Sequence, residues 1–174
     1  AISLVNIAAE AGCAVTIVTH RPGQASAAQF NAARRRMDLQ PSEIAARLTI
    51  SNRTAAVVMT HDFETDLALL PALLDSPASY IGLLGPKART ARLLTDLHQR
   101  GRRLTPTDIA RLRTPVGLDI GSITPQEIAL SIVSEIIAVR NGRSGTPLRD
   151  REVTRHEPYR RDGMIELPSG VIVD

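Results

Sequence analysis

Short apolar runs alternate with helix-like stretches along most of this chain, and no other feature constrains the fold as strongly. The run at residues 55–60 is almost continuously apolar, which is typical of a strand covered on both faces. The expected strands are residues 15–18, 55–60 and 79–84. The expected helices are residues 2–12, 41–48, 64–74, 89–101, 106–112 and 125–141. Strands that alternate with helices indicate an α/β fold, in which helices wrap a parallel sheet.

The pattern is weaker in three places. Residues 25–39 fit neither a helix nor a strand, and residues 142–160 are polar and rich in arginine, as in a loose tail. Residues 164–167 and 171–173 flank a Pro-Ser-Gly sequence, which indicates a weak hairpin. The expected division is a domain over residues 1–148 and a polar tail over residues 149–174.

Composition excludes several classes of protein. The chain has 21 basic and 18 acidic residues, a net charge of +3, but only four aromatic residues. None of these lies inside an arginine cluster, so the stacking surface of a nucleic-acid-binding protein is missing. The single cysteine, Cys13, can form neither an internal disulfide nor a thiolate metal cluster. No apolar run approaches the roughly 20 residues of a membrane span, and no signal peptide is visible. We expect a cytoplasmic protein that binds neither nucleic acid nor membrane.

Ligands of such sheets bind beyond the carboxyl ends of the strands, so the segments after each strand are the candidate sites. After the first strand, Thr19 and His20 provide no carboxylate for a ribose diol, which counts against ordinary NAD binding. After the second, His61 could carry a proton or donate to a ligand, although it has no partner histidine at metal-ligand spacing. Asp62 could bind a ligand or cap the helix that follows.

The third segment predicts an anion site. Gly82, Gly85 and Pro86 lead from a strand into a helix whose start carries Lys87 and Arg89. The free N–H groups of a helix start attract anions, and two cations strengthen that attraction.

The fourth segment, residues 115–121, surrounds Asp119 with Gly117 and Gly121. These glycines predict a tightly shaped loop, or a linker that needs positive φ angles. The helix that follows has a capping box, with Thr124 three residues before Glu127. No catalytic set emerges, because Ser131 and Ser134 have no neighbouring histidine.

Four motifs in order resemble one known family. They are residues 59–66 (MTHDFETD), 80–89 (YIGLLGPKAR), 115–121 (PVGLDIG) and 124–132 (TPQEIALSI) followed by Glu135. Together they resemble the C-terminal Rossmann-like domain of the xanthine dehydrogenase accessory factor family (XdhC/CoxI). The resemblance covers residues 1 to about 148, and it implies a three-layer Rossmann-like domain with a mainly parallel sheet.

The resemblance implies a maturation factor rather than an enzyme. Members bind the molybdenum cofactor (molybdopterin), keep it available for sulfuration by a cysteine desulfurase, and pass it to a molybdenum hydroxylase apoenzyme such as xanthine dehydrogenase or carbon monoxide dehydrogenase. Carried over, the cofactor crevice would be edged by His61, Asp62, Gly82, Gly85, Pro86, Lys87, Arg89, Gly117, Asp119 and Gly121.

The chain departs from the family at its start. The first strand of the family would precede Ala1, so we expect the sheet to lack it. The strand edge that this leaves would favour a homodimer or strand exchange, and residues 171–173 are a candidate to fill it. Two other classes stay open. One is an NAD(P)-binding oxidoreductase domain, and the other is an assembly module without a ligand.

Overall fold

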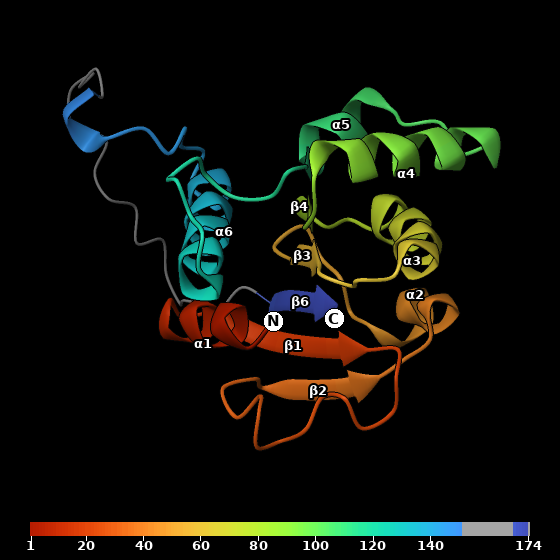
Figure 1. Ribbon diagram of the computed structural model, residues 1–174, viewed down its shortest axis with the longest axis horizontal. Coiled ribbons are helices and arrows are strands. Elements are labelled where there is room, and N and C mark those ends of the chain that lie inside the picture. Colours follow the sequence, from red (N-terminus) through yellow and green to blue (C-terminus); the bar gives the residue numbers. More distant parts are fainter. Residues whose placement is uncertain (151–168, 174) are drawn as a thin grey trace.

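The computed structural model describes residues 1–150 and 169–173, and within them one parallel sheet forms the centre of the molecule (Figure 1). Its strand order is β2-β1-β6-β3-β4-β5. The strands are β1 (Ala14–Thr19), β2 (Arg35–Asp38), β3 (Ala55–Val58), β4 (Tyr80–Leu83), β5 (Leu112–Arg113) and β6 (Ser169–Val173). The helices are α1 (Ile2–Glu10), η1 (Pro41–Glu43), α2 (Ile44–Arg47), α3 (Phe63–Asp75), α4 (Lys87–Gln99), α5 (Pro106–Arg111), α6 (Pro125–Arg140) and η2 (Leu148–Asp150).

Helices cover both faces of the sheet, so the expected three-layer α/β architecture is confirmed. On one face, α1 and α6 enclose a core with Val15, Val57 and Tyr80 from the strands. On the other face, α2, α3 and α4 enclose a core with Val18, Val58 and others. Figure 1 shows α1 and α6 together on the left and α2 and α3 on the right. Every residue of β4 is buried, as expected of a strand with helices on both sides.

The sequence analysis did not predict two of the strands. β2 lies in the unassigned stretch and reads Arg-Arg-Met-Asp, with three of its four residues exposed. Among the described strands it pairs with β1 alone, at the edge of the sheet, where polar side chains reach water. β5 has two residues and follows α5 directly, so the expected helix over 106–112 ends one residue early.

The central position of the sheet is filled from the far end of the sequence. In the usual dinucleotide-fold order, the place between the second and fourth strands belongs to the first strand. Here β6 lies there, in parallel register with β1 through Ala14–Ser169 and with β3 through Ala55–Gly170. Residues 171–173 were a candidate to fill the strand edge left by the missing first strand, and as part of β6 they pair there with β1 and β3.

The predicted tail is described only in part. Residues 164–167, the first half of the predicted hairpin, lie outside the described residues, and both edges of β6 are paired with β1 and β3. The domain boundary at residue 148 stays a prediction. No helix in the described part of the chain is long and apolar enough to cross a membrane.

Candidate functional site

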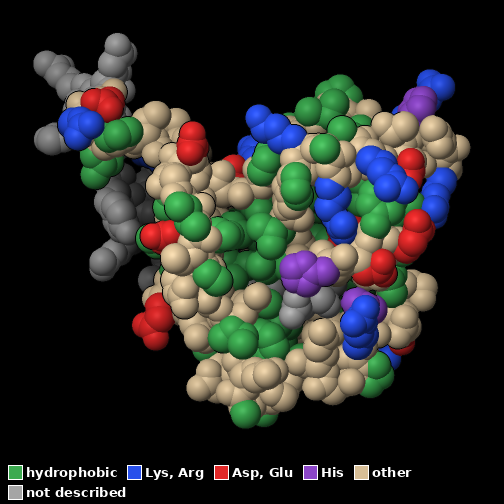
Figure 2. Space-filling model, in the orientation of Figure 1, with side chains coloured by type: hydrophobic (Ala, Val, Ile, Leu, Met, Phe, Trp, Pro, Cys, Tyr) green, Lys and Arg blue, Asp and Glu red, His purple; other side chains and the backbone are tan. Residues whose placement is uncertain are grey.

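The parallel strands bring the predicted site segments to one edge of the sheet. Residues 59–62 follow β3, residues 84–86 follow β4, and residues 114–124 follow β5. Partly buried hydrophobic side chains line this edge: Met59, Leu84, Val116 and Ile128. Figure 2 shows a hollow lined by hydrophobic side chains beside α6, with histidine side chains at its margin and Lys and Arg side chains over α4. We call this hollow the carboxyl-edge crevice.

Asp62 caps the helix that follows β3. It is the N-cap of α3, and its Oδ2 accepts hydrogen bonds from the Thr65 amide at 3.2 Å and the Thr65 hydroxyl at 2.5 Å. The hydrogen bond from the Thr65 side chain lowers the pKa of Asp62 below its usual value. The capping interpretation of Asp62 is therefore confirmed. The adjacent His61 is exposed at the margin of the crevice.

Arg89 is held by a carboxylate that sequence reasoning did not place in the site. Its Nη2 lies 2.6 Å from Oδ2 of Asp66, whose side chain is 7% exposed. The other oxygen of Asp66 accepts a hydrogen bond from the Thr60 hydroxyl. Gly85 has a φ of 144°, and a Cβ there would lie 3.1 Å from Cδ of Arg89, so the glycine makes room for the arginine. Arg89 thus ties the start of α4 to the start of α3.

Lys87 is the freer of the two predicted cations. It is the first residue of α4 and is exposed. Pro86, the N-cap residue, has no side-chain hydrogen bond to the helix, and its carbonyl accepts from the amides of Arg89 and Thr90. The amides of Lys87 and Ala88 donate no hydrogen bond to another described residue. Free amides beside an ammonium group favour an anion such as a phosphate.

The loop after β5 packs against β4 and α4. A Cβ on Gly82 would lie 2.6 Å from Cγ2 of Val116, so only glycine allows the loop to approach the strand this closely. The hydroxyls of Thr90 and Thr114 lie 2.5 Å apart and join the loop to α4. Gly82 therefore acts through packing, and it brings residues 114–117 beside the β4 segment.

Glu135 anchors the same loop from α6. Its Oε2 accepts a hydrogen bond from the Tyr80 hydroxyl at 2.6 Å and from the Gly117 amide at 2.8 Å. Gly117 has a φ of 105° and lies against Ser131. Burial, and then the hydrogen bond to Glu135, raise the pKa of Tyr80 well above its usual value. The sequence motif included Glu135, but only the fold shows what it holds.

Asp119 and Gly121 do not join the other candidates. Both are exposed and neither contacts a residue of the β3 or β4 segments by any hydrogen bond or ion pair within the described residues. The preceding Leu118 is fixed to Ser131, whose hydroxyl donates to the Leu118 carbonyl at 2.6 Å. Ser131 is thus a structural residue, and Asp119 lies beyond the anchored part of the loop.

The end of β1 repeats the arrangement found at the end of β3. Each strand leads into a Thr-His pair, and each threonine hydroxyl lies within hydrogen-bond distance of a carboxylate and of the carbonyl two residues later. For Thr19 the carboxylate is Asp38, at 2.7 Å, and this hydrogen bond lowers the pKa of Asp38. Sequence reasoning missed Asp38 because its strand was not recognised. Nδ1 of His20 is buried and has no hydrogen-bond partner among the described residues.

The carboxyl-edge crevice has groups suited to binding a ligand. It offers an apolar floor, free amides with Lys87, and polar groups at its margin. Its carboxylates Asp38 and Asp66 are already engaged by threonine or arginine. No group of three potential metal-ligating side chains lies close together within the described residues.

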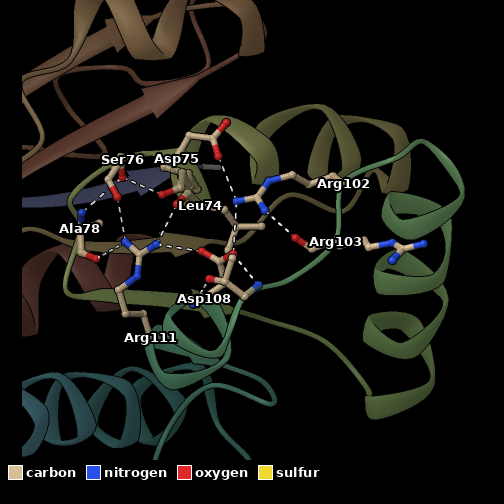
Figure 3. A network of polar contacts seen from close by, with 10 residues as sticks. Leu74, Asp75, Ser76, Ala78, Arg102, Arg103, Asp108 and Arg111 are labelled. Atoms are coloured by element: carbon tan, nitrogen blue, oxygen red, sulfur yellow. Dashed lines mark hydrogen bonds and ion pairs between the residues drawn. The ribbon is translucent and has the colours of Figure 1, made fainter.

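A second arginine–aspartate cluster lies away from the crevice and has a structural role (Figure 3). Arg111 donates hydrogen bonds of 2.7 Å to the carbonyls of Leu74, Ser76 and Ala78 at the end of α3. It also pairs with the buried Asp108, which in turn lies 3.3 Å from Arg102. This cluster, which we call the α5 lock, joins α5 to α3.

Comparison with known proteins places the domain in a family. The family model described as the XdhC Rossmann domain matches residues 1–136. The chain belongs to the XdhC family. Both the suspected family and the Rossmann-like fold are therefore confirmed.

Relatives of this XdhC domain have names connected with molybdenum enzymes. One relative, from Bacillus subtilis (strain 168), is named as a probable subunit of xanthine dehydrogenase. It is 34% identical over 139 residues, which cover 80% of this chain and 39% of that protein. The molybdenum cofactor insertion chaperone PaoD of Escherichia coli (strain K12) is 30% identical over 103 residues, or 59% of this chain and 31% of PaoD.

A crystal structure of a xanthine dehydrogenase from Bacillus halodurans has a similar fold. It aligns with a TM-score of 0.69 and 31% identity, and the alignment covers 82% of this chain and 40% of that one. This XdhC domain thus spans about two fifths of the length of these first relatives.

Proposed function

We propose that this XdhC domain binds the molybdenum cofactor in the carboxyl-edge crevice, as part of a maturation factor for a molybdenum hydroxylase. The observation that carries the proposal is the start of α4, where Lys87 and two free amides stand beside an apolar hollow in an XdhC fold. The name of the relative PaoD, a molybdenum cofactor insertion chaperone, supports the choice of cargo.

The residues fit such a cargo by their chemistry. A pterin phosphate would lie against the amides of Lys87 and Ala88, with the ammonium group of Lys87 as its counter-charge. The flat pterin would lie over the apolar floor, and its polar edge would meet Asp62 or His61. Arg89 orients the start of α4 through Asp66.

The finer parts of the proposal concern the handling of the cargo. The domain would hold the cofactor while a cysteine desulfurase sulfurates it, and would then release it to the hydroxylase apoenzyme. A protein that binds and releases an intact cofactor needs anion and stacking contacts but no nucleophile, which agrees with the structural role of Ser131. We place these steps in the cytoplasm and in a homodimer, as in the sequence analysis.

The test is to purify the chain without oxygen from cells that make molybdenum cofactor, and to oxidise any bound pterin to its fluorescent derivative. We expect pterin in stoichiometric amount, and a large loss in Lys87→Ala. Lys87→Arg, which keeps the charge, should retain more pterin than Lys87→Ala. Arg47→Ala removes an exposed cation of α2 and serves as the control.

Two results would contradict the proposal. One is a chain without pterin under conditions that load a full-length relative. The other is equal pterin content in Lys87→Ala and the unchanged chain. A parallel titration with NAD and NADP measures the oxidoreductase alternative, and binding of either in place of pterin would favour that class. A stable complex with a hydroxylase polypeptide, without pterin, would favour the assembly module.

A further inference from the structure

A cavity lies at the opposite edge of the sheet from the crevice, where the strands begin. Its volume is about 340 Å³. Among the described residues, α1 and α6 form one wall, and the first residues of β1, β3 and β4 form the other. Figure 1 shows α1 and α6 on the same side of the sheet, so the cavity lies beneath the two helices. Nothing in the proposed function uses this space.

Small side chains at the strand starts leave room for the cavity. Val15 of β1 and Ala55 of β3 both line it. Ala8 of α1 faces the same space and adds little volume.

The lining is apolar in its depth and basic at one end. Leu4, Ala8, Val15, Val57, Ile136 and Val139 are among the lining residues. Arg140 ends α6, is exposed, and belongs to the same lining. The hydroxyl of Tyr80, another lining residue, is already bonded to Glu135. The polar residues Asn52, Arg53 and Ser79 also belong to the lining. The cavity therefore combines an apolar surface with polar and positively charged groups.

We propose that this cavity binds a single-chain amphiphilic anion, with its hydrocarbon tail between α1, α6 and the sheet and its carboxylate at Arg140. The volume lies at the lower end of the range for small-molecule sites, about 300–1,000 Å³, and suits a medium-length acyl chain better than a dinucleotide. The inference is independent of cofactor binding, because the two sites lie at opposite edges of the sheet.

Cys13 provides the readout, because it is the only cysteine of the chain and lines the cavity. Burial raises the pKa of its thiol, so alkylation by iodoacetamide is measured at alkaline pH, by mass spectrometry of the intact chain. Saturating decanoate should protect Cys13. At ten times its Kd, the ligand should slow alkylation about tenfold, since only the free protein reacts. Each methylene added from octanoate to decanoate should tighten binding about three- to fourfold.

Two variants separate tail from head recognition. Ala55→Leu fills the cavity and should abolish the protection of Cys13 by decanoate. If leucine at this position impairs folding, Ala55→Val fills less of the cavity and should reduce the protection. Arg140→Gln should weaken decanoate binding several-fold and leave binding of uncharged decanol unchanged. Arg47→Gln, outside the cavity, should change neither. Circular dichroism confirms that each variant folds.

Several outcomes would overturn the inference. Alkylation of Cys13 at the same rate with and without decanoate would show that the cavity binds no such ligand. Equal protection in Ala55→Leu would place the ligand elsewhere. Equal binding of decanoate and decanol would remove the role of Arg140. Protection by vesicles of phosphatidylglycerol, without protection by dissolved decanoate, would show a membrane surface in place of a free amphiphile.

Discussion

Two arginines of this domain form ion pairs with buried aspartates, but one joins two helices and the other lies in the candidate site. In the α5 lock, Arg111 is 17% exposed and its hydrogen bonds go to three carbonyls at the end of α3 and to Asp108. In the crevice, Arg89 is 27% exposed, and Asp66 is its one hydrogen-bond partner within the described residues. Arg89 also lies over the ring of Phe63, at 5.7 Å from the ring centroid.

The hydrogen-bond partners of a guanidinium group indicate whether the arginine stabilises the fold or belongs to a binding site. Arg111 satisfies backbone groups that would otherwise end a buried helix without partners. Among the described residues, most N–H groups of Arg89 have no hydrogen-bond partner, and they lie next to the start of α4. Similar pairs of residue types therefore have different consequences when they are removed, and the following predictions measure that difference.

The largest expected effect is the loss of the α5 lock. Arg111→Met removes three hydrogen bonds to carbonyls and one of the positive charges that compensate the buried Asp108 carboxylate. This should lower the free energy of unfolding by about 3–5 kcal/mol. Urea unfolding followed by circular dichroism measures this change. Arg103→Met, at an exposed side chain, should change stability by less than about 0.5 kcal/mol. A loss below about 1 kcal/mol in Arg111→Met would show that the lock is not what joins α5 to α3.

A smaller loss of stability is expected in the crevice, together with a loss of cargo. Arg89→Met breaks a partly exposed ion pair with Asp66 and should cost about 1–3 kcal/mol. It should also lower the pterin content more than Arg111→Met does when both are purified well below their unfolding temperatures. The comparison fails if the two variants lose pterin in proportion to their loss of stability.

The acid dependence of stability should distinguish the two regions again. Burial alone would raise the pKa of Asp108, but hydrogen bonds from Thr105 and Arg111 and the charge of Arg102 lower it overall. The folded state therefore binds fewer protons than the unfolded state just below about pH 4, the usual range of an aspartate. The stability that Asp108 contributes is present above that pH and is lost as the pH falls through its lowered pKa.

Urea midpoints measured from about pH 5 to about pH 2 test this sign. Asp108→Asn should flatten the acid limb of the curve, because it removes one titrating group. Asp62 is half-buried and its pKa is also lowered. Asp62→Asn should give a weaker change than Asp108→Asn, because solvent screens the interactions of Asp62 more than those of the buried Asp108. A steeper acid limb in Asp108→Asn would contradict the assigned direction.

The smallest effect concerns the cap of α3. Asp62→Ala should cost about 1 kcal/mol, because it removes the acceptor of the Thr65 amide, whereas Asp62→Ser keeps an N-cap oxygen and should cost only a few tenths. Thermal unfolding of both variants measures the cap. If Asp62 also meets the cargo, Asp62→Ser should lose pterin while it keeps its stability. Equal pterin in Asp62→Ser and the unchanged chain would limit Asp62 to capping.

Local patterns predicted the parts of the fold that depend on neighbours in sequence. The capping box of Thr124 and Glu127 starts α6 as expected, with Glu127 accepting from the Thr124 amide at 2.8 Å. The apolar run after residue 54 forms β3, and the glycines and Pro86 lead into α4, two residues before the expected start. In each case the residues that indicate the helix or strand lie within a few residues of the element itself.

Partners far apart in sequence could not be predicted in this way. The sequence around Arg89 does not indicate its ion pair with Asp66. The sequence around Gly117 does not indicate its hydrogen bond to Glu135. Asp38 was missed because β2 is polar, and an edge strand carries no apolar run. These pairs depend on which strand ends become neighbours, as β3 and β4 do for Asp66 and Arg89, and short sequence patterns do not show this.

The place of β6 also affects how this sheet can form. During synthesis, residues 169–173 leave the ribosome after the other five strands, yet they join β1 to β3. Without these residues, no other described strand joins β1 to β3, and the edges of β1 and β3 that pair with β6 have no partner. Pairing between residues 14 and 169 closes a very long loop, and contacts of such sequence separation slow folding. During synthesis, the edges of β1 and β3 that later pair with β6 would therefore be exposed to growing chains on neighbouring ribosomes.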